Sequence, residues 1–115
     1  MSEEKQDQKL VIVVLDDREI LDDLLMGFVD LGVRGATVLD SQGMGQIIRQ
    51  DMPIFSGLAN LFPQTSGSVT ILSVMDHSLV ESSFELIDEI VGEIDRPNSA
   101  ICFSLPVEQF RGIKH

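Results

Sequence analysis

A chain of 115 residues with 43% hydrophobic and 23% charged residues has the composition of one globular domain. Its formal net charge of −11 repels nucleic acids and anionic membrane surfaces, so we exclude both as main partners. The single cysteine, Cys102, excludes an internal disulfide and is typical of a reducing compartment.

The first residues predict a lead-in rather than a targeting segment. Residues 1–9 are polar and charged, so we expect them to be disordered and to precede one domain over residues 10–115. They lack the apolar core of a signal peptide, and no apolar run approaches the roughly 20 residues that span a bilayer. We therefore expect a cytoplasmic protein without membrane insertion.

The first half of the domain predicts a strand, a helix and a second strand. Residues 10–15 are a continuous β-branched run, typical of a central strand. Asp16 and Glu19 have the spacing of a capping box at a helix start. Gly32 can end that helix in the left-handed conformation, and residues 36–40 predict the next strand. One face of the helix is apolar: Ile20, Leu21, Leu24, Leu25, Phe28 and Val29.

A long connection without a clear period follows, over residues 46–67. It carries too many apolar side chains for a disordered linker. We expect this loop to pack on its own domain, on a neighbouring subunit or on a ligand. Residues 56–62, between two prolines, could form one short helix.

The second half repeats the order of the first. Residues 69–75 predict another central strand, and Ser78 with Glu81 has the form of a capping box. The helix that follows reaches about residue 92, and after a loop over residues 93–99 a last strand covers residues 100–105. Pro106 interrupts that strand and favours a place at the edge of the sheet. The buried stripe of the helix consists of Val80, Phe84, Ile87 and Val91.

Two such βαβ units usually interleave into one antiparallel sheet of four strands with both helices on one face. This is the ferredoxin-like sandwich of the α+β class. Its other face would expose the apolar residues of the strands, so we expect oligomerisation to bury that face.

Two short motifs, within this order of elements, resemble those of a known family. G-V-R-G-A-T-V at residues 32–38 and Q-G-M-G at residues 42–45 resemble G-x-x-G-x-T-V and K-G-F-G of the PII nitrogen-regulatory signalling proteins. The resemblance implies a homo-oligomer, a trimer, with ligand clefts between its subunits. It also implies that the long loop, here residues 46–67, contacts a partner protein, and that an adenine nucleotide is a possible ligand.

The resemblance assigns ligand binding to five residues by position. Thr37 would lie where the family has a threonine that contacts adenine. Gly43 and Gly45 would form the turn into the loop, with the ligand beside them and Gln46, where backbone amides can approach a phosphate. Arg111 would match a basic residue near the end of the family's fold.

The chain also departs from the PII pattern. Ile47 stands where the family has a glutamine linked to ATP and 2-oxoglutarate binding, and Ala100 and Ile113 stand where a lysine and an arginine are usual. The absence of tyrosine excludes the uridylylation of some PII proteins. We therefore expect a divergent, PII-like protein whose cofactor the sequence does not identify.

No pattern for catalysis or for a metal stands out. His77, Cys102 and His115 do not have the spacing of a zinc site. The acidic pairs at residues 16–17 and 22–23 fit a helix start and a solvated helix face. We expect a protein that is not an enzyme. The alternative function is that of a ferredoxin-like oligomer with a structural or metal-handling role, as in CutA-type trimers.

Four arginines fall in or beside predicted loops and ends: Arg34, Arg49, Arg96 and Arg111. In an acidic protein, arginines that converge on one cleft would mark an anion site. Pairing with surface carboxylates is the other interpretation.

Overall fold

The computed structural model describes residues 7–51, 68–92 and 100–112, and side chains 49–51 lie outside that description. Four predictions therefore fall wholly or mostly outside the described residues. They are the lead-in, the long loop at residues 46–67, the short helix at residues 56–62 within it and the loop at residues 93–99.

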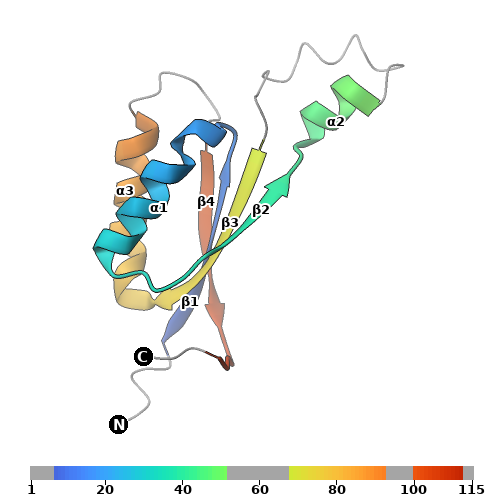
Figure 1. Cartoon of the computed structure of the whole chain (residues 1–115). Helices are drawn as coiled ribbons and strands as arrows, with labels where there is room; N and C mark the ends of the chain where they lie inside the picture. The colour runs from blue at the N-terminus through green and yellow to red at the C-terminus, as the bar shows by residue number, and fades with distance from the viewer. Residues whose placement is uncertain (1–6, 52–67, 93–99, 113–115) are drawn as a thin grey trace.

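One antiparallel sheet of four strands, in the order β2-β3-β1-β4, forms the centre of the fold (Figure 1). Its members are β1 (Gln8–Leu15), β2 (Thr37–Ser41), β3 (Ser68–Asp76) and β4 (Ala100–Val107). β1 pairs along its whole length with both β3 and β4, which confirms it as a central strand. It begins at Gln8, two residues before the predicted start.

Two helices cover one face of the sheet. α1 (Leu21–Leu31) and α3 (Val80–Gly92) lie side by side there. A 3-10 turn leads into each helix: η2 (Arg18–Ile20) into α1 and η4 (His77–Leu79) into α3. The predicted ferredoxin-like sandwich of the α+β class is confirmed.

Both predicted capping boxes are wrong. Asp17, rather than Asp16, caps the first helical segment, since its carboxylate accepts a hydrogen bond from the amide of Glu19 at 2.9 Å. Asp76 caps the second by accepting a bond of 2.9 Å from the amide of Ser78. In both cases an aspartate before the 3-10 turn bonds the amide two residues on, a local geometry that competes with the longer capping box.

The core lies between the sheet and the two helices. Alternate strand residues point into it and are fully buried, among them Val11, Val13, Leu15, Val69 and Ile71. Leu24 and Phe28 of α1 cover them. Val29, predicted on the buried face, is 65% exposed, because one further residue turns the helix by about 100° beyond Phe28.

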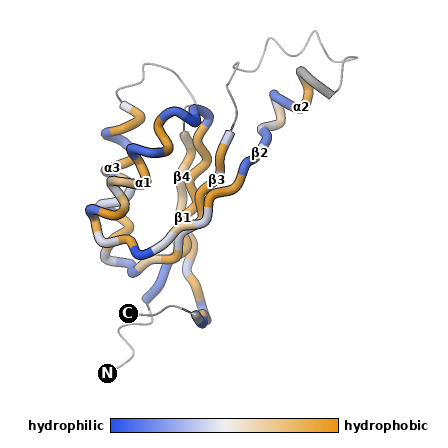
Figure 2. The backbone as a smooth tube through the Cα atoms, viewed as in Figure 1, coloured by the Kyte–Doolittle hydropathy of each residue, from blue (hydrophilic) through white to orange (hydrophobic). Residues whose placement is uncertain are grey.

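The opposite face of the sheet is apolar, and no described element covers it. Residues paired across an antiparallel ladder share a face, so the three outward residues of β1 lie beside those of β4, and Figure 2 shows hydrophobic residues along both strands. Ile101, Phe103 and Leu105 are 60%, 44% and 45% exposed. We call this surface the open face; it consists of Leu10, Ile12, Val14, Leu39, Leu72, Val74, Ile101, Phe103 and Leu105.

Part of the predicted loop is a helix, α2 (Met44–Asp51). Met44, Ile47 and Ile48 recur at spacings of three and four, a helical period that the flanking glycines hide. Gly45 costs such a helix about 1 kcal/mol, which the structure tolerates in the first turn. In Figure 1, α2 projects from the end of β2, away from α1 and α3.

Pro106 does not end the last strand. β4 continues to Val107, and Pro106 pairs with Lys9 of β1. β4 is an edge strand as predicted. A proline is tolerated at an edge because one side of the strand has no ladder bonds to lose. Among the described residues, no helix is both long and apolar enough to cross a membrane.

Candidate functional site

A hollow of about 570 Å³ lies at one end of the open face, where β2 begins. Its walls come from β1, β3, the turn before β2 and the segment after β4. We call it the Thr37 hollow, lined chiefly by Leu10, Leu72, Val74, Arg34, Thr37 and Gly112. The chain therefore brings three apolar strand residues together with one cation and one hydroxyl.

The turn into β2 is anchored where it leaves α1. Gly32 ends the helix as predicted, with φ +96°, a left-handed conformation that favours glycine. The amide of Val33 donates to the carbonyl of Phe28 at 2.9 Å, and the side chain of Val33 is buried. These contacts set the direction in which Arg34 leaves the helix layer.

A second anchor holds the middle of the same turn. Ser73 of β3 is 2% exposed, and its hydroxyl donates a hydrogen bond of 2.7 Å to the carbonyl of Gly35. This bond fixes the backbone between Arg34 and Thr37 on the sheet. A sequence signal for it existed, since Ser73 occupies the buried register of an otherwise apolar strand.

Arg34 is the cation of the hollow. Its side chain is exposed, and within the described part of the chain it takes part in neither of the ion pairs, which use Lys9 and Arg18. Arg111 lies next to Gly112, which lines the same hollow with φ +95°. Arg111 itself lines a separate hollow with the three residues before it, so among the described arginines singled out from the sequence only Arg34 lines the Thr37 hollow.

The predicted glycine turn lies at the other end of β2. Gly43 precedes α2 and accepts a bond of 3.1 Å from the amide of Ile47, while Gly45 lies inside the helix rather than in a turn. Gln46 is half-buried, and its Oε1 is buried without a hydrogen-bond partner in the part of the chain that the structure describes.

The five predicted ligand residues therefore lie at three places in a single chain. Thr37 lines the hollow, whereas Arg111 lines a separate one and only its neighbour Gly112 reaches the Thr37 hollow. Gly43, Gly45 and Gln46 lie beyond the five residues of β2, at its opposite end. The binding roles of all five stay predictions.

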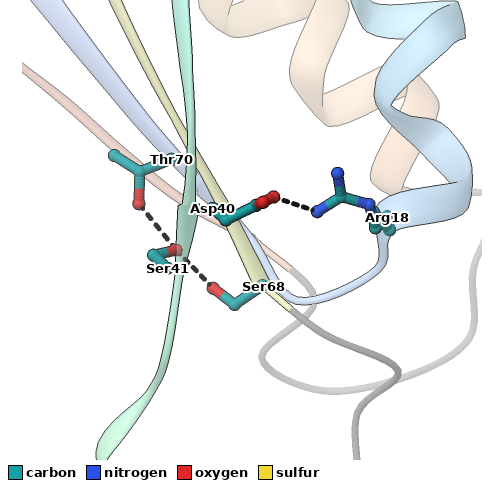
Figure 3. A network of polar contacts seen from close by, with 5 residues as sticks. All are labelled: Arg18, Asp40, Ser41, Ser68 and Thr70. Carbon is teal, nitrogen blue, oxygen red and sulfur yellow. Dashed lines mark hydrogen bonds and ion pairs between the residues drawn. The ribbon is translucent and has the colours of Figure 1, made fainter.

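Polar contacts hold the end of β2 from which α2 starts (Figure 3). On the helix side, Arg18 Nη1 lies 2.6 Å from Asp40 Oδ1. On the other side, the Ser41 hydroxyl lies 2.9 Å from that of Ser68 and accepts a bond of 3.0 Å from Thr70. The exposed ion pair contributes at most about 1 kcal/mol to stability, so its main effect is to fix the position of Asp40 relative to Arg18.

Two titratable groups among the described residues have a pKa that the fold shifts. Burial, and then the charge of Asp88, raise the pKa of the Cys102 thiol. Hydrogen bonds from Ser78 lower the pKa of Asp76. No three histidine, cysteine or acidic side chains in the described ranges are grouped to hold a metal ion, so the metal-handling alternative gains no support there.

Comparisons with known proteins connect this geometry to one fold. No protein-family model matches the chain, and no curated protein matches it in sequence. The crystal structure of Arabidopsis thaliana PII bound to citrate superimposes with a TM-score of 0.64, over 89% of this chain and 78% of that one, at 20% identity. The chain has a PII-like fold.

A second solved structure gives the same result over nearly the whole chain. A functionally unknown protein from Pediococcus pentosaceus ATCC 25745 matches with a TM-score of 0.64 and 24% identity, over 94% of this chain and 99% of that chain. The likeness to both structures is one of fold.

Proposed function

We propose that the chain is a PII-like regulatory protein that assembles into a homo-oligomer, a trimer, through the open face. The observation that carries this proposal is the open face itself, with the Thr37 hollow at its margin. Burying apolar surface stabilises an assembly by roughly 25 cal/mol per Å². A contiguous apolar face on a small acidic domain is best explained by a copy of the same chain that covers it.

The proposed ligand is a small anion, with an adenine nucleotide as the leading candidate. It would lie in the Thr37 hollow, which a second subunit on the open face would border. Arg34 and Thr37 supply a charge and a hydroxyl, and the strand residues supply apolar contact. The Arabidopsis PII structure, described as bound to citrate, offers a parallel with a small organic anion.

The proposed output is a change in affinity for a partner protein. Residues 46–67 follow β2 at the end opposite the hollow, and α2 begins that segment by projecting from the sheet. A ligand in the hollow shifts the populations of this segment if the chain binds the ligand more tightly when the segment holds one conformation than when it holds another. In this proposal the protein regulates by binding and catalyses no reaction.

Two measurements test the proposal. Light scattering after size exclusion is expected to give three times the 12.7 kDa of one chain. Calorimetry with ATP, ADP, AMP and cyclic dinucleotides is expected to show binding of at least one of them. A measured mass of a single chain would contradict the proposed oligomer. The absence of binding heat with every one of these ligands would contradict nucleotide sensing.

A further inference from the structure

We propose that the outer surface of the helix layer binds a basic amphipathic helix of a partner protein. This surface lies on the side of the fold opposite the open face. We call the site the Met26 patch; it consists of five exposed residues of α1: Asp22, Asp23, Met26, Val29 and Asp30. The proposed function uses neither this surface nor these residues, so the inference goes beyond it.

Two apolar side chains of the Met26 patch stay uncovered after the proposed assembly. Met26 and Val29 are 63% and 65% exposed. Met26 follows the buried Leu24 by two positions, which turn the helix by about 200° and direct Met26 away from the sheet. Val29 lies three positions after Met26, so the two side chains are neighbours on the helix surface. An oligomer formed through the open face therefore leaves both in contact with solvent.

Three carboxylates surround the side chain of Met26. Asp22 and Asp23 lie four and three positions before it, and Asp30 lies four positions after it. Residues at these spacings are neighbours on a helix surface. The thioether side chain of methionine is flexible and packs against apolar groups of varied shape. The patch therefore offers an adaptable apolar contact inside a ring of negative charge.

The second helix, α3, extends the negative charge beside the patch. α1 and α3 are in contact at Gly27 and Leu86. α1 carries three exposed acidic residues and α3 carries four, which makes seven, and neither helix contains a basic residue. No ion pair among the described residues uses any of the seven. Glu85 is repelled by three carboxylates at spacings of three or four: Glu81, Asp88 and Glu89. A cationic partner would relieve this repulsion.

Charge decides which partner fits the patch. A second copy has the same net charge of −11 and the same acidic helices, so it is repelled. A metal ion would leave Met26 and Val29 in water. The apolar residues of a basic amphipathic helix cover Met26 and Val29, while its lysines or arginines lie against the carboxylates. From Asp22 to Asp30 the patch is about 12 Å long, which matches about two turns of such a helix.

The test titrates the full ¹⁵N-labelled chain with a synthetic peptide of about 14 residues, in which leucines recur at helical spacing and lysines fill the other positions. The amide signals of residues 22–30 and 81–89 are expected to shift. A peptide of the same composition without that spacing is expected to bind at least about threefold more weakly. Binding of the first peptide is expected to weaken several-fold as salt rises from about 0.1 M to about 1 M, because the Debye length falls from about 10 Å to about 3 Å.

Variants separate the apolar contribution from the charge contribution. Met26→Gln keeps the charge and is expected to weaken binding at least about threefold, since it removes apolar contact. Asp23→Asn with Asp30→Asn is expected to weaken binding by a similar factor, because ion pairs are lost. The matched control, Asp7→Asn with Glu108→Gln, raises the net charge by the same amount outside the helices and is expected to change the affinity by less than about twofold. Far-UV circular dichroism checks that every variant keeps the fold.

Several results overturn the inference. The absence of shifts at residues 22–30 does so, and shifts confined to residues 101–105 would place the peptide on the open face instead. An equal loss of affinity in Asp23→Asn/Asp30→Asn and in its control would show only a general attraction to an acidic protein. Equal binding of the two peptides, or unchanged affinity in Met26→Gln, would remove the apolar contact. The mass of the oligomer and the heat of nucleotide binding are measured separately, so this inference and the proposed function can fail independently.

Discussion

Ser73 shows how one buried hydroxyl can position a surface that it does not touch. It lies on the helix side of β3, whereas the Thr37 hollow lies on the other side, and a bond to Gly35 joins the two. Ser73→Ala is expected to lower the free energy of unfolding by about 1 kcal/mol, since it removes the hydrogen bond that a buried hydroxyl donates to Gly35. Urea denaturation at a fixed protein concentration measures this change.

Ser41→Ala is the matched control for that substitution. The Ser41 hydroxyl is only part-buried and bonds to the hydroxyls of Ser68 and Thr70. Water can replace it as a partner, so the expected loss is less than half that of Ser73→Ala. Equal losses in the two variants would contradict the special role of Ser73.

The fold raises the pKa of the Cys102 thiol. Burial, and secondarily the negative charge of Asp88, raise its pKa, so less thiolate is present near pH 8 than in a free cysteine. We expect a thiol–disulfide exchange reagent to label the folded chain several-fold more slowly than the denatured chain. Asp88→Asn is expected to speed labelling only modestly, because burial is the larger cause. Equal labelling rates for the folded and denatured chains would show that the fold does not protect this thiol.

At the scale of elements, α1 and α3 meet at a glycine. A Cβ placed on Gly27 would lie 2.5 Å from Cδ2 of Leu86, so Leu86 occupies the space that a side chain would need. Gly27→Ala is therefore expected to destabilise the chain, because overpacking of 1–3 kcal/mol or so exceeds the gain in helix propensity of about 1 kcal/mol.

Leu86→Ala is expected to reverse the sign of the stability change that Gly27→Ala causes. In a Leu86→Ala background the space is free, and Gly27→Ala is expected to stabilise the chain by up to about 1 kcal/mol. Gly92→Ala meets no atom within 4 Å and is expected to change stability equally in both backgrounds. Thermal and urea unfolding of the unaltered chain, Gly27→Ala, Leu86→Ala and the double variant measures the coupling between residues 27 and 86. An identical effect of Gly27→Ala in both backgrounds would disprove the contact.

Helices and strands could be predicted where the spacing of apolar residues and the position of turn residues indicate the same element. The run at residues 10–15 and the left-handed stop at Gly32 allow one interpretation each, and both are confirmed. α2 could not be predicted in the same way, because Gly43 and Gly45 bracket its start and resemble a turn. Asp17 and Asp76 cap through local bonds that a spacing rule for longer capping boxes does not detect.

At the scale of the whole molecule, the open face controls assembly in the function that we propose. Phe103→Glu places a carboxylate on that face, halfway along the edge strand β4, and is expected to convert the oligomer into single chains of 12.7 kDa, because burying an unpaired charge costs several kcal/mol. Light scattering after size exclusion measures the mass. Val29→Glu changes a 65% exposed residue on the helix layer and is expected to leave assembly intact. An unchanged mass in Phe103→Glu would place the interface elsewhere.

The Thr37 hollow belongs to this scale too, and the sequence could not predict it. Leu10, Val74 and Gly112 are far apart in the chain, and only the register of β1 with its two neighbours brings them to one end of the sheet. Thr37 was predicted through a family motif, and Arg34 stood in that motif without an assigned role. The motif therefore drew attention to Thr37, whereas the side chains that line the hollow with it could be identified only from the fold, and a binding role for Thr37 stays a prediction.

The pairing of β1 also has a consequence for how fast the chain folds. Gln8 pairs with both Asp76 and Val107, so the first strand of the sheet reaches its final partners only when distant parts of the chain arrive. Contacts of such large sequence separation slow folding, since loop closure must precede the gain from pairing. Until β4 docks, β1 presents an unpaired apolar edge to its neighbours in solution, and refolding yield is expected to fall as the protein concentration rises.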